Sequence, residues 1–154
     1  HPAHWKNAVI YRPKSLVLGI GCDRGTAPDL VNRGVLTLLA RHGLSPKSVK
    51  ELATIDAKLD EPALLTLCEQ YGWPLRAFPP GELDVVSGIQ NPSEKVKHYV
   101  GSRGVAEPAA LLAAEAEELL VPKQIYTEPG AGRSMTLAVA RRTFVKRRME
   151  VDSL

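Results

Sequence analysis

The chain alternates short apolar runs with longer stretches in which apolar residues recur every three or four positions. Continuous apolar runs bounded by glycine or proline predict strands, and the longer periodic stretches predict amphipathic helices. The predicted order is strand, helix, strand, helix and strand, over residues 15–21, 28–43, 51–55, 60–72 and 74–78. Strands that alternate with helices need crossover connections, so this half predicts a parallel sheet with helices on both faces.

The second half of the chain is more helical. Residues 80–86 predict one or two helical turns, 91–100 a capped helix, and the Ala-rich segment 106–119 a buried helix. Two further β-type runs, 119–126 and 135–140, are separated by a loop too short for a parallel crossover and predict an antiparallel hairpin. The expected fold class is α/β: a three-layer α/β/α arrangement with a mixed, mostly parallel sheet of about five strands.

Length and composition indicate one folded domain. The 154 residues are 44% hydrophobic and 24% charged, a composition that excludes disorder for the body of the chain. We expect residues 1–14 to be a linker or N-terminal extension, 15–140 the α/β domain and 141–154 a basic tail. Because no apolar run approaches the roughly 18 residues of a membrane span and no secretory leader opens the chain, we expect no membrane partner.

The charge distribution argues against a nucleic-acid partner. The formal net charge of +3 arises in the tail, residues 141–154, and only 5% of the chain is aromatic, which leaves few stacking platforms. Cys22 and Cys68 have no CxxC partner and are too few for a disulfide framework, which favours a reducing cytoplasm. The spacing of cysteines and histidines fits no metal site, so we expect neither a metal ligand set nor a cofactor.

The first candidate site is the segment Gly19-Ile-Gly-Cys-Asp-Arg-Gly-Thr26, between the first strand and the following helix. Its glycine spacing fits neither the dinucleotide fingerprint nor a phosphate loop. Backbone N–H groups after Gly21, together with Arg24, Gly25 and a helix-capping Thr26, predict an anion site. A tight turn that needs positive φ at glycine explains the same segment and stays open as the alternative.

The second candidate site is Thr54-Ile-Asp-Ala-Lys-Leu-Asp-Glu-Pro62, again at the carboxyl end of a predicted strand. Helix capping explains Asp60 as the N-cap and Glu61 as a carboxylate that favours the helix dipole. Capping does not explain Asp56 and Lys58, which makes these two the stronger candidates for chemistry.

Four other residues are weaker candidates. Lys123 is predicted at the end of a central strand, with an edge-strand gatekeeper as the alternative. Cys22 lies near a helix N-terminus, which would lower the pKa of a nucleophilic thiol, whereas a buried inert thiol is the alternative. His42 and His98 have no adjacent ligand or triad partner and are expected at the surface or at helix ends.

Taken together, six segments resemble the CobE and CbiG C-terminal domain family of cobalamin biosynthesis. They are GIGCDRGT at 19–26, LATIDAKLDEP at 52–62, NPSEKV at 91–96, VAEPAALLAA at 105–114, LLVPKQ at 119–124 and MTLAVA at 135–140. The resemblance implies an α/β fold with a mixed sheet and a role in corrin-ring assembly. The larger protein that contains such a domain resembles cobalt-precorrin-5A hydrolase, which opens the ring A δ-lactone and releases acetaldehyde.

The implied ligand is a corrinoid tetrapyrrole, whose many carboxylates surround a flat apolar macrocycle; its cobalt arrives within the substrate. The expected substrate-binding residues are Gly21, Cys22, Arg24, Gly25, Thr26, Thr54, Lys123 and Thr136. Lactone opening needs a base and a group that stabilises the oxyanion. Asp56 or Glu61 is expected to be the base, and Lys58 or Lys123 the electrostatic partner.

Two other functions stay open. One is a non-catalytic, CobE-like binder or carrier of corrinoid intermediates, and the other is an anion- or nucleotide-binding α/β domain unrelated to cobalamin. For the hydrolase function, other cobalamin-pathway domains or enzymes are the expected partners.

Overall fold

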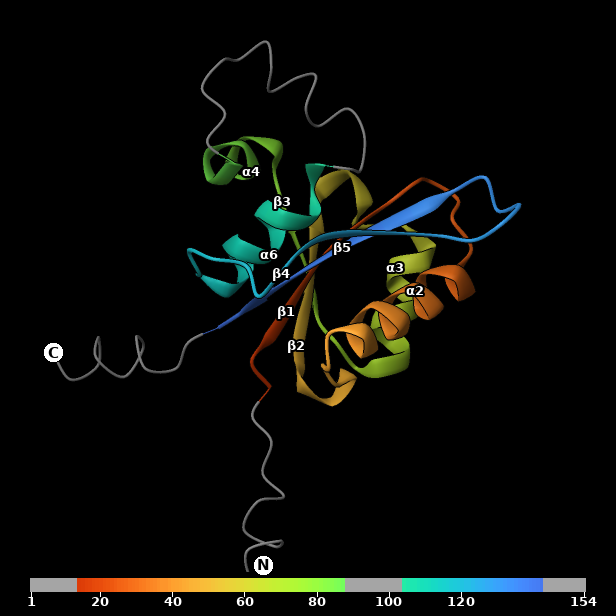
Figure 1. Ribbon diagram of the computed structural model, residues 1–154. Helices are drawn as coiled ribbons and strands as arrows, with labels where there is room; N and C mark the ends of the chain where they lie inside the picture. The colour runs from red at the N-terminus through yellow and green to blue at the C-terminus, as the bar shows by residue number, and fades with distance from the viewer. Residues whose placement is uncertain (1–13, 88–103, 143–154) are drawn as a thin grey trace, which may run out of the picture.

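The computed structural model describes residues 14–87 and 104–142. Figure 1 shows the elements, with η for a 3-10 helix: β1 (Leu16–Cys22), α2 (Pro28–Arg41), η1 (Pro46–Ser48), β2 (Val49–Ile55), η2 (Asp56–Lys58), α3 (Pro62–Tyr71), β3 (Leu75–Phe78), α4 (Pro80–Ser87), α6 (Ala106–Ala114), β4 (Val121–Thr127) and β5 (Ser134–Arg141). The helix predicted over 91–100, with His98, and most of both terminal extensions lie outside the described residues.

The strands form one five-stranded sheet in the order β3-β2-β1-β5-β4. The pairs β1–β2 and β2–β3 are parallel, whereas β1–β5 and β4–β5 are antiparallel. The predicted mixed sheet that ends in an antiparallel hairpin is therefore confirmed. Its antiparallel share is larger than expected, because the hairpin places β5 beside β1 at the centre of the sheet.

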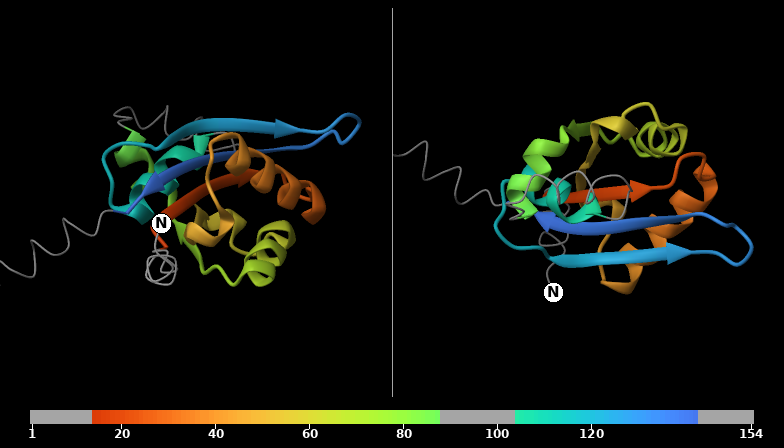
Figure 2. Two further views of the ribbon diagram at one scale, coloured as in Figure 1. Left: turned by 60° about the horizontal axis from the view of Figure 1, so that its bottom comes forward. Right: turned by 90° about the horizontal axis from the view of Figure 1, so that it is seen from above.

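Helices cover both faces of the sheet, so the predicted three-layer arrangement is also confirmed. Helices α2 and α3 lie on one face, and α6 with α4 lies on the other (Figures 1 and 2). Side chains alternate between the faces along β1: Leu18 belongs to the core under α2 and α3, and Val17 to the core under α6. The α6 side is built mainly from alanines, and these small side chains let α6 lie close to the sheet.

Helix α6 is shorter than predicted. It ends at Ala114 rather than near Leu119, because Glu115 adopts the left-handed conformation with φ 55° and turns the chain. Strand β4 then begins at Val121 and forms an edge of the sheet. The prediction that Lys123 ends a central strand is therefore wrong: Lys123 is exposed in the edge strand, as in the alternative.

The caps of two helices also differ from prediction. The N-cap of α2 is Ala27, so Thr26 does not cap it; the Thr26 hydroxyl instead donates to the Asp23 carbonyl oxygen at 2.6 Å. The N-cap of α3 is Glu61 rather than Asp60, and the Glu61 side chain makes no capping hydrogen bond. Both helices begin with proline, whose fixed φ suits the first turn.

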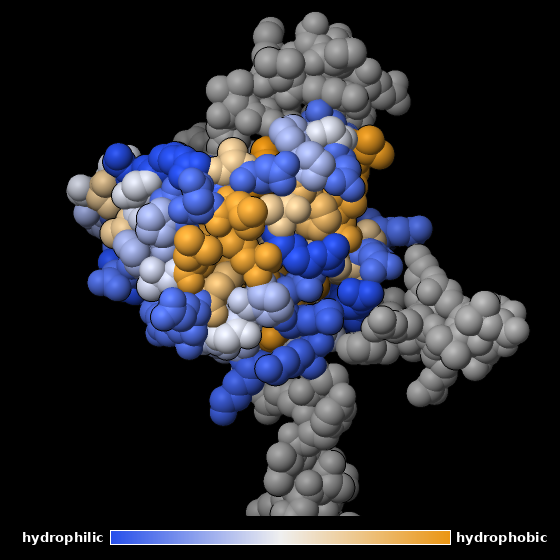
Figure 3. All heavy atoms as spheres, turned by 180° about the vertical axis from the view of Figure 1, so that it is seen from behind, coloured by the Kyte–Doolittle hydropathy of each residue, from blue (hydrophilic) through white to orange (hydrophobic). Residues whose placement is uncertain are grey.

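The surface combines charged regions with apolar ones. Figure 3 shows apolar side chains gathered on the face opposite to the view of Figure 1, with hydrophilic side chains around them. The exposed large apolar side chains include Leu59 after η2, Leu65 on α3 and Val85 on α4. None of the described helices has the length and apolar character needed to cross a membrane.

Candidate functional site

Strands β1 and β2 diverge at their carboxyl ends. Their parallel pairing ends at Gly19 and Ala53, although β1 continues to Cys22. Beyond that point the Thr54 hydroxyl donates to the Ile20 carbonyl oxygen at 2.8 Å and takes the place of the backbone pairing. In open α/β sheets, ligands bind outside the carboxyl ends of the strands, so a binding site is expected at the loops that follow β1 and β2.

Three loops meet at this end of the sheet: 23–27 after β1, 56–61 after β2 and the hairpin loop 128–133. Figure 2 shows the hairpin extending beyond the carboxyl end of β1. Arg133 Nε donates to the Arg24 carbonyl oxygen at 2.9 Å and fastens the hairpin loop to the first loop. Segments far apart in sequence thus form one surface.

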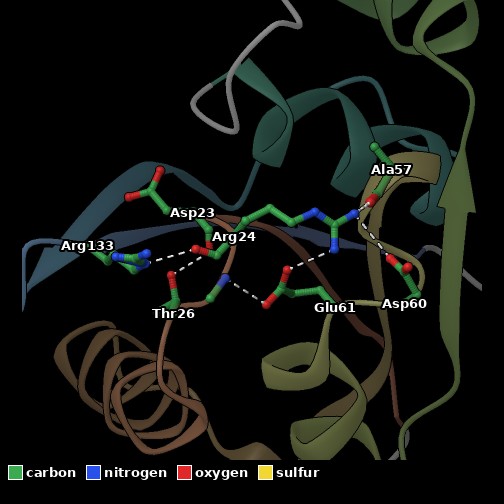
Figure 4. A network of polar contacts seen from close by, with 8 residues as sticks. Asp23, Arg24, Thr26, Ala57, Asp60, Glu61 and Arg133 are labelled. Carbon is green, nitrogen blue, oxygen red and sulfur yellow. Dashed lines mark hydrogen bonds and ion pairs between the residues drawn. The ribbon is translucent and has the colours of Figure 1, made fainter.

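The first and second loops are joined by a network around Glu61 (Figure 4). The Glu61 side chain is only 1% exposed, and its two oxygens accept from Arg24 Nη1 and from the Gly25 amide, each at 3.2 Å. Arg24 Nη2 also donates to Asp60 Oδ1 at 3.1 Å and to the Ala57 carbonyl oxygen. Gly25 has φ 77°, a left-handed conformation that favours glycine.

The donors of the first loop are used inside the protein. The amides of Asp23, Gly25 and Thr26 donate to Ser134 O, Glu61 Oε2 and Asp23 O, respectively. The Arg24 guanidinium lies against two carboxylates. This geometry corresponds to the tight-turn alternative, with Gly25 in the left-handed conformation.

Asp56 and Lys58 differ from Glu61 because they stand on the surface of a single turn, η2. Asp56 is exposed and Lys58 is half-buried. Within the described ranges, neither side chain makes a hydrogen bond or ion pair, so both are available to a ligand. Leu59, which follows them, is 51% exposed and offers an apolar surface beside the two charges.

Cys22 is a buried, protonated thiol. Its burial raises the pKa to about 11, and the nearby Lys58 ammonium lowers the pKa by less than burial raises it. Of the two alternatives for Cys22, the raised pKa and the burial favour the inert thiol over the nucleophile. The effect of Lys58 on the pKa of Cys22 also shows that the Lys58 charge lies near the end of β1.

The structure brings together six of the predicted site residues and separates others from them. Those around the loops are Arg24, Gly25, Thr26, Asp56, Lys58 and Glu61. Gly21 and Thr136 are paired partners in β1 and β5, and Thr54 is a fully buried residue of β2. Lys123 lies in β4 two residues after Val121, whose partner Val139 pairs with Leu18 in mid-sheet, so it is remote from the loops.

Arg133 and Ser134 were missed as parts of this region. The Ser134 amide donates to Asp23 Oδ2 at 3.1 Å, and this contact spans 111 positions in the sequence. No local pattern signals a partner so distant; only the prediction that the hairpin ends beside the first strand could have suggested it.

A pocket of about 300 Å³ lies beside the network, between the first loop and the hairpin. Its Glu128 is bound by Arg33, whose Nε and Nη2 each donate at 2.7 Å, and by the Tyr126 hydroxyl, also at 2.7 Å. The hydrogen bonds from Arg33 and then Tyr126 hold the pKa of Glu128 at about 2. Across residues 14–87 and 104–142, no cluster of three or more His, Cys, Asp or Glu side chains is suited to a metal ion.

Comparison with known proteins gives a consistent result. The family model described as Cobalamin synthesis G C-terminus matches residues 16–140. A cobalt-precorrin-5A hydrolase of Priestia megaterium is 44% identical over 119 residues, which cover 77% of this chain and 32% of that enzyme. Protein CobE of a Sinorhizobium species is 37% identical over 113 residues, or 73% of each chain. The chain thus spans about a third of the hydrolase and most of CobE.

Solved structures show the same fold. The crystal structure of CobE, a protein from the cobalamin (vitamin B12) biosynthetic pathway, has a TM-score of 0.66 at 29% identity and covers 87% of this chain and 96% of that one. The cobalamin biosynthesis protein chiG from Agrobacterium tumefaciens has a TM-score of 0.59 at 28% identity, covering 80% of this chain and 95% of its own.

Proposed function

The chain belongs to the Cobalamin synthesis G C-terminus family, and on this basis we propose that it is a domain of a cobalt-precorrin-5A hydrolase. Its function lies in cobalamin biosynthesis. The proposed reaction opens the ring A lactone of cobalt-precorrin-5A and releases acetaldehyde. The observation that carries this proposal is the pair Asp56 and Lys58, an exposed carboxylate and a half-buried ammonium on one turn at the carboxyl end of β2.

Lactone opening requires both charges of this turn. The Asp56 carboxylate removes a proton from water, and the water oxygen bonds to the lactone carbonyl carbon. The Lys58 ammonium stabilises the negative charge that develops on the carbonyl oxygen. When the tetrahedral intermediate collapses, the ring C–O bond breaks, the carboxyl group forms, and the proton held by Asp56 passes to the departing alkoxide. Acetaldehyde is then released from the alcohol: its O–H proton leaves, its C–O bond becomes a carbonyl as the C–C bond to the macrocycle breaks, and the ring carbon takes up a proton.

The surroundings of the turn suit a flat, carboxylate-rich macrocycle. Leu59 offers apolar contact to the ring, and Lys58 with the exposed Arg133 offers charge to its carboxylates. Arg24 is 56% exposed but already faces Asp60 and Glu61, so we assign it to holding the loop. Thr54 and Thr136, both buried, support the end of β1 rather than contact the substrate.

A chimaeric enzyme tests the proposal. Residues 16–140 replace the matched third of the Priestia megaterium hydrolase, and acetaldehyde release from cobalt-precorrin-5A is measured without oxygen. We expect turnover in the chimaera and a loss of about 100-fold or more in Asp56→Asn and Lys58→Ala. Asp29→Asn and Lys47→Ala, which change exposed charges on α2 and η1, serve as controls and should leave turnover unchanged.

The result that contradicts the assignment is wild-type turnover in both Asp56→Asn and Lys58→Ala. A chimaera that binds the corrinoid without releasing acetaldehyde, while the parent hydrolase releases it, would instead favour the CobE-like carrier.

A further inference from the structure

We infer that Glu61 is a positioning residue that holds the turn carrying Asp56 and Lys58. It is not the general base that removes a proton from the attacking water. This inference rests on the proposed function for its catalytic part. Its structural part, that one buried carboxylate joins the loops after β1 and β2, stands on the geometry alone.

Burial and hydrogen bonding remove Glu61 from contact with substrate. Its side chain is 1% exposed, and each of its oxygens already accepts a hydrogen bond, one from Arg24 and one from the Gly25 amide. A general base must come within hydrogen-bond reach of the proton that it removes. Asp56, on the exposed side of the same loop, is open to such a contact, whereas the enclosed Glu61 is not.

Arg24 connects Glu61 to the turn that carries Asp56 and Lys58. Its guanidinium is oriented by Glu61 through Nη1 and donates through Nη2 to the carbonyl oxygen of Ala57. Ala57 is the residue between Asp56 and Lys58, so Arg24 holds the backbone at the centre of the proposed catalytic pair (Figure 4).

The turn has few other supports. Its own backbone contributes a hydrogen bond from the Leu59 amide to Asp56 O at 3.1 Å and one from the Glu61 amide to Lys58 O at 3.0 Å. Catalytic groups on a surface turn lose effectiveness when their geometry loosens by even about 1 Å. Among the described residues, the contact from Arg24 holds the turn from outside, in addition to the packing of η2 against β3.

The structural part is tested by hydrogen–deuterium exchange on the full 154-residue chain. In Glu61→Gln and in Arg24→Met, we expect exchange at the Gly25 amide and in residues 56–61 to accelerate about tenfold or more, because a hydrogen bond to a charged group is lost. The core strands β1 and β5 should keep their protection. Glu69→Gln, an exposed carboxylate on α3, is the matched control and should exchange as the wild type does.

The catalytic part is tested by kinetics in the chimaeric hydrolase. Glu61→Gln should lower kcat while keeping the acid limb of the pH–rate profile, since Asp56 still supplies the base. The double variant Arg24→Met/Glu61→Gln should be no slower than the slower single variant, because both act through the same contact.

The outcomes separate the two levels. Unchanged exchange in Glu61→Gln and Arg24→Met overturns the inference whatever the enzyme does. Loss of the acid limb in Glu61→Gln, with the limb kept in Asp56→Asn, overturns it by making Glu61 the base. Accelerated exchange combined with full activity of Asp56→Asn supports the structural part and rejects the proposed function.

Discussion

Gly19 in β1 lies directly against the backbone of Ala106 at the start of α6. A Cβ at residue 19 would lie far inside the van der Waals contact distance of the Ala106 carbonyl oxygen and 2.7 Å from the Ala110 amide nitrogen. The atoms it would meet are backbone, which cannot move without shifting the helix. The absence of a side chain at Gly19 therefore sets how closely α6 approaches the sheet.

Gly19→Ala should lower the free energy of unfolding by about 3 kcal/mol, because overpacking forces a backbone shift. Urea denaturation followed by circular dichroism measures the change. Gly81→Ala is the matched control: it lies in α4 with nothing within 4 Å of its Cβ, and should be neutral or stabilising. Equal stabilities of the two variants would contradict the close approach of α6.

The ion pair of Arg33 with Glu128 should give the protein an acid-dependent stability. The folded-state pKa of Glu128 is lowered from 4.5 to about 2, chiefly by the hydrogen bonds from Arg33. Because the pKa is lower in the folded state, the Glu128 carboxylate stabilises the fold at pH values above its unfolded-state pKa of 4.5. This stabilisation is lost as the pH falls from about 4.5 to 2. Thermal melts should show Glu128→Gln less stable than wild type at pH 7, with the difference closing towards pH 2; a constant difference would argue against this.

Both cysteines should be unreactive in the folded protein. Burial raises the pKa of Cys22 and of Cys68 to about 11, so at neutral pH each is an enclosed, protonated thiol. A thiol reagent such as dithionitrobenzoate should react slowly with the native chain and with two equivalents at once after denaturation. Rapid native reaction that is lost in Cys22→Ala would show instead that Cys22 is accessible and activated.

Glu51 and Arg76 should behave as a coupled pair. Glu51 is 6% exposed and accepts from Arg76 Nη1 at 3.0 Å; Arg76 also lies over the Phe78 ring, 5.1 Å from its centre. Arg76→Met should destabilise the protein by about 2 kcal/mol, because it leaves a buried carboxylate without its partner. Adding Glu51→Gln should recover part of this loss in chemical denaturation; strictly additive losses would mean the pair is not coupled.

Local sequence patterns predicted where the five strands lie along the chain, but not which strands lie side by side in the sheet. Apolar runs predicted all five strands, because the signal for a strand depends only on a few consecutive residues. That Lys123 lies in an edge strand depends on the strand order, which is set by the packing of distant segments. The end of α6 was missed because the left-handed conformation of Glu115 is unusual for a residue other than glycine.

The candidate site divides in the same way. Asp56 and Lys58 stand out in the sequence because capping rules, which are local, do not explain them; their role in the site stays a prediction. The role of Glu61 could not be found in that way, since its Arg24 partner is 37 positions away. The pattern supplied the residue types, and only the fold showed which carboxylate is buried and which is exposed.

The most direct test of the central claim is an anaerobic titration of the 154-residue chain with cobalt-precorrin-5A, followed by its visible spectrum. We predict saturable binding by the wild type and by Lys47→Ala, and about tenfold weaker binding by Lys58→Ala, which loses a charged contact at the site. No spectral change with the wild type, or identical binding by all three proteins, would contradict a corrinoid site at the carboxyl end of β2.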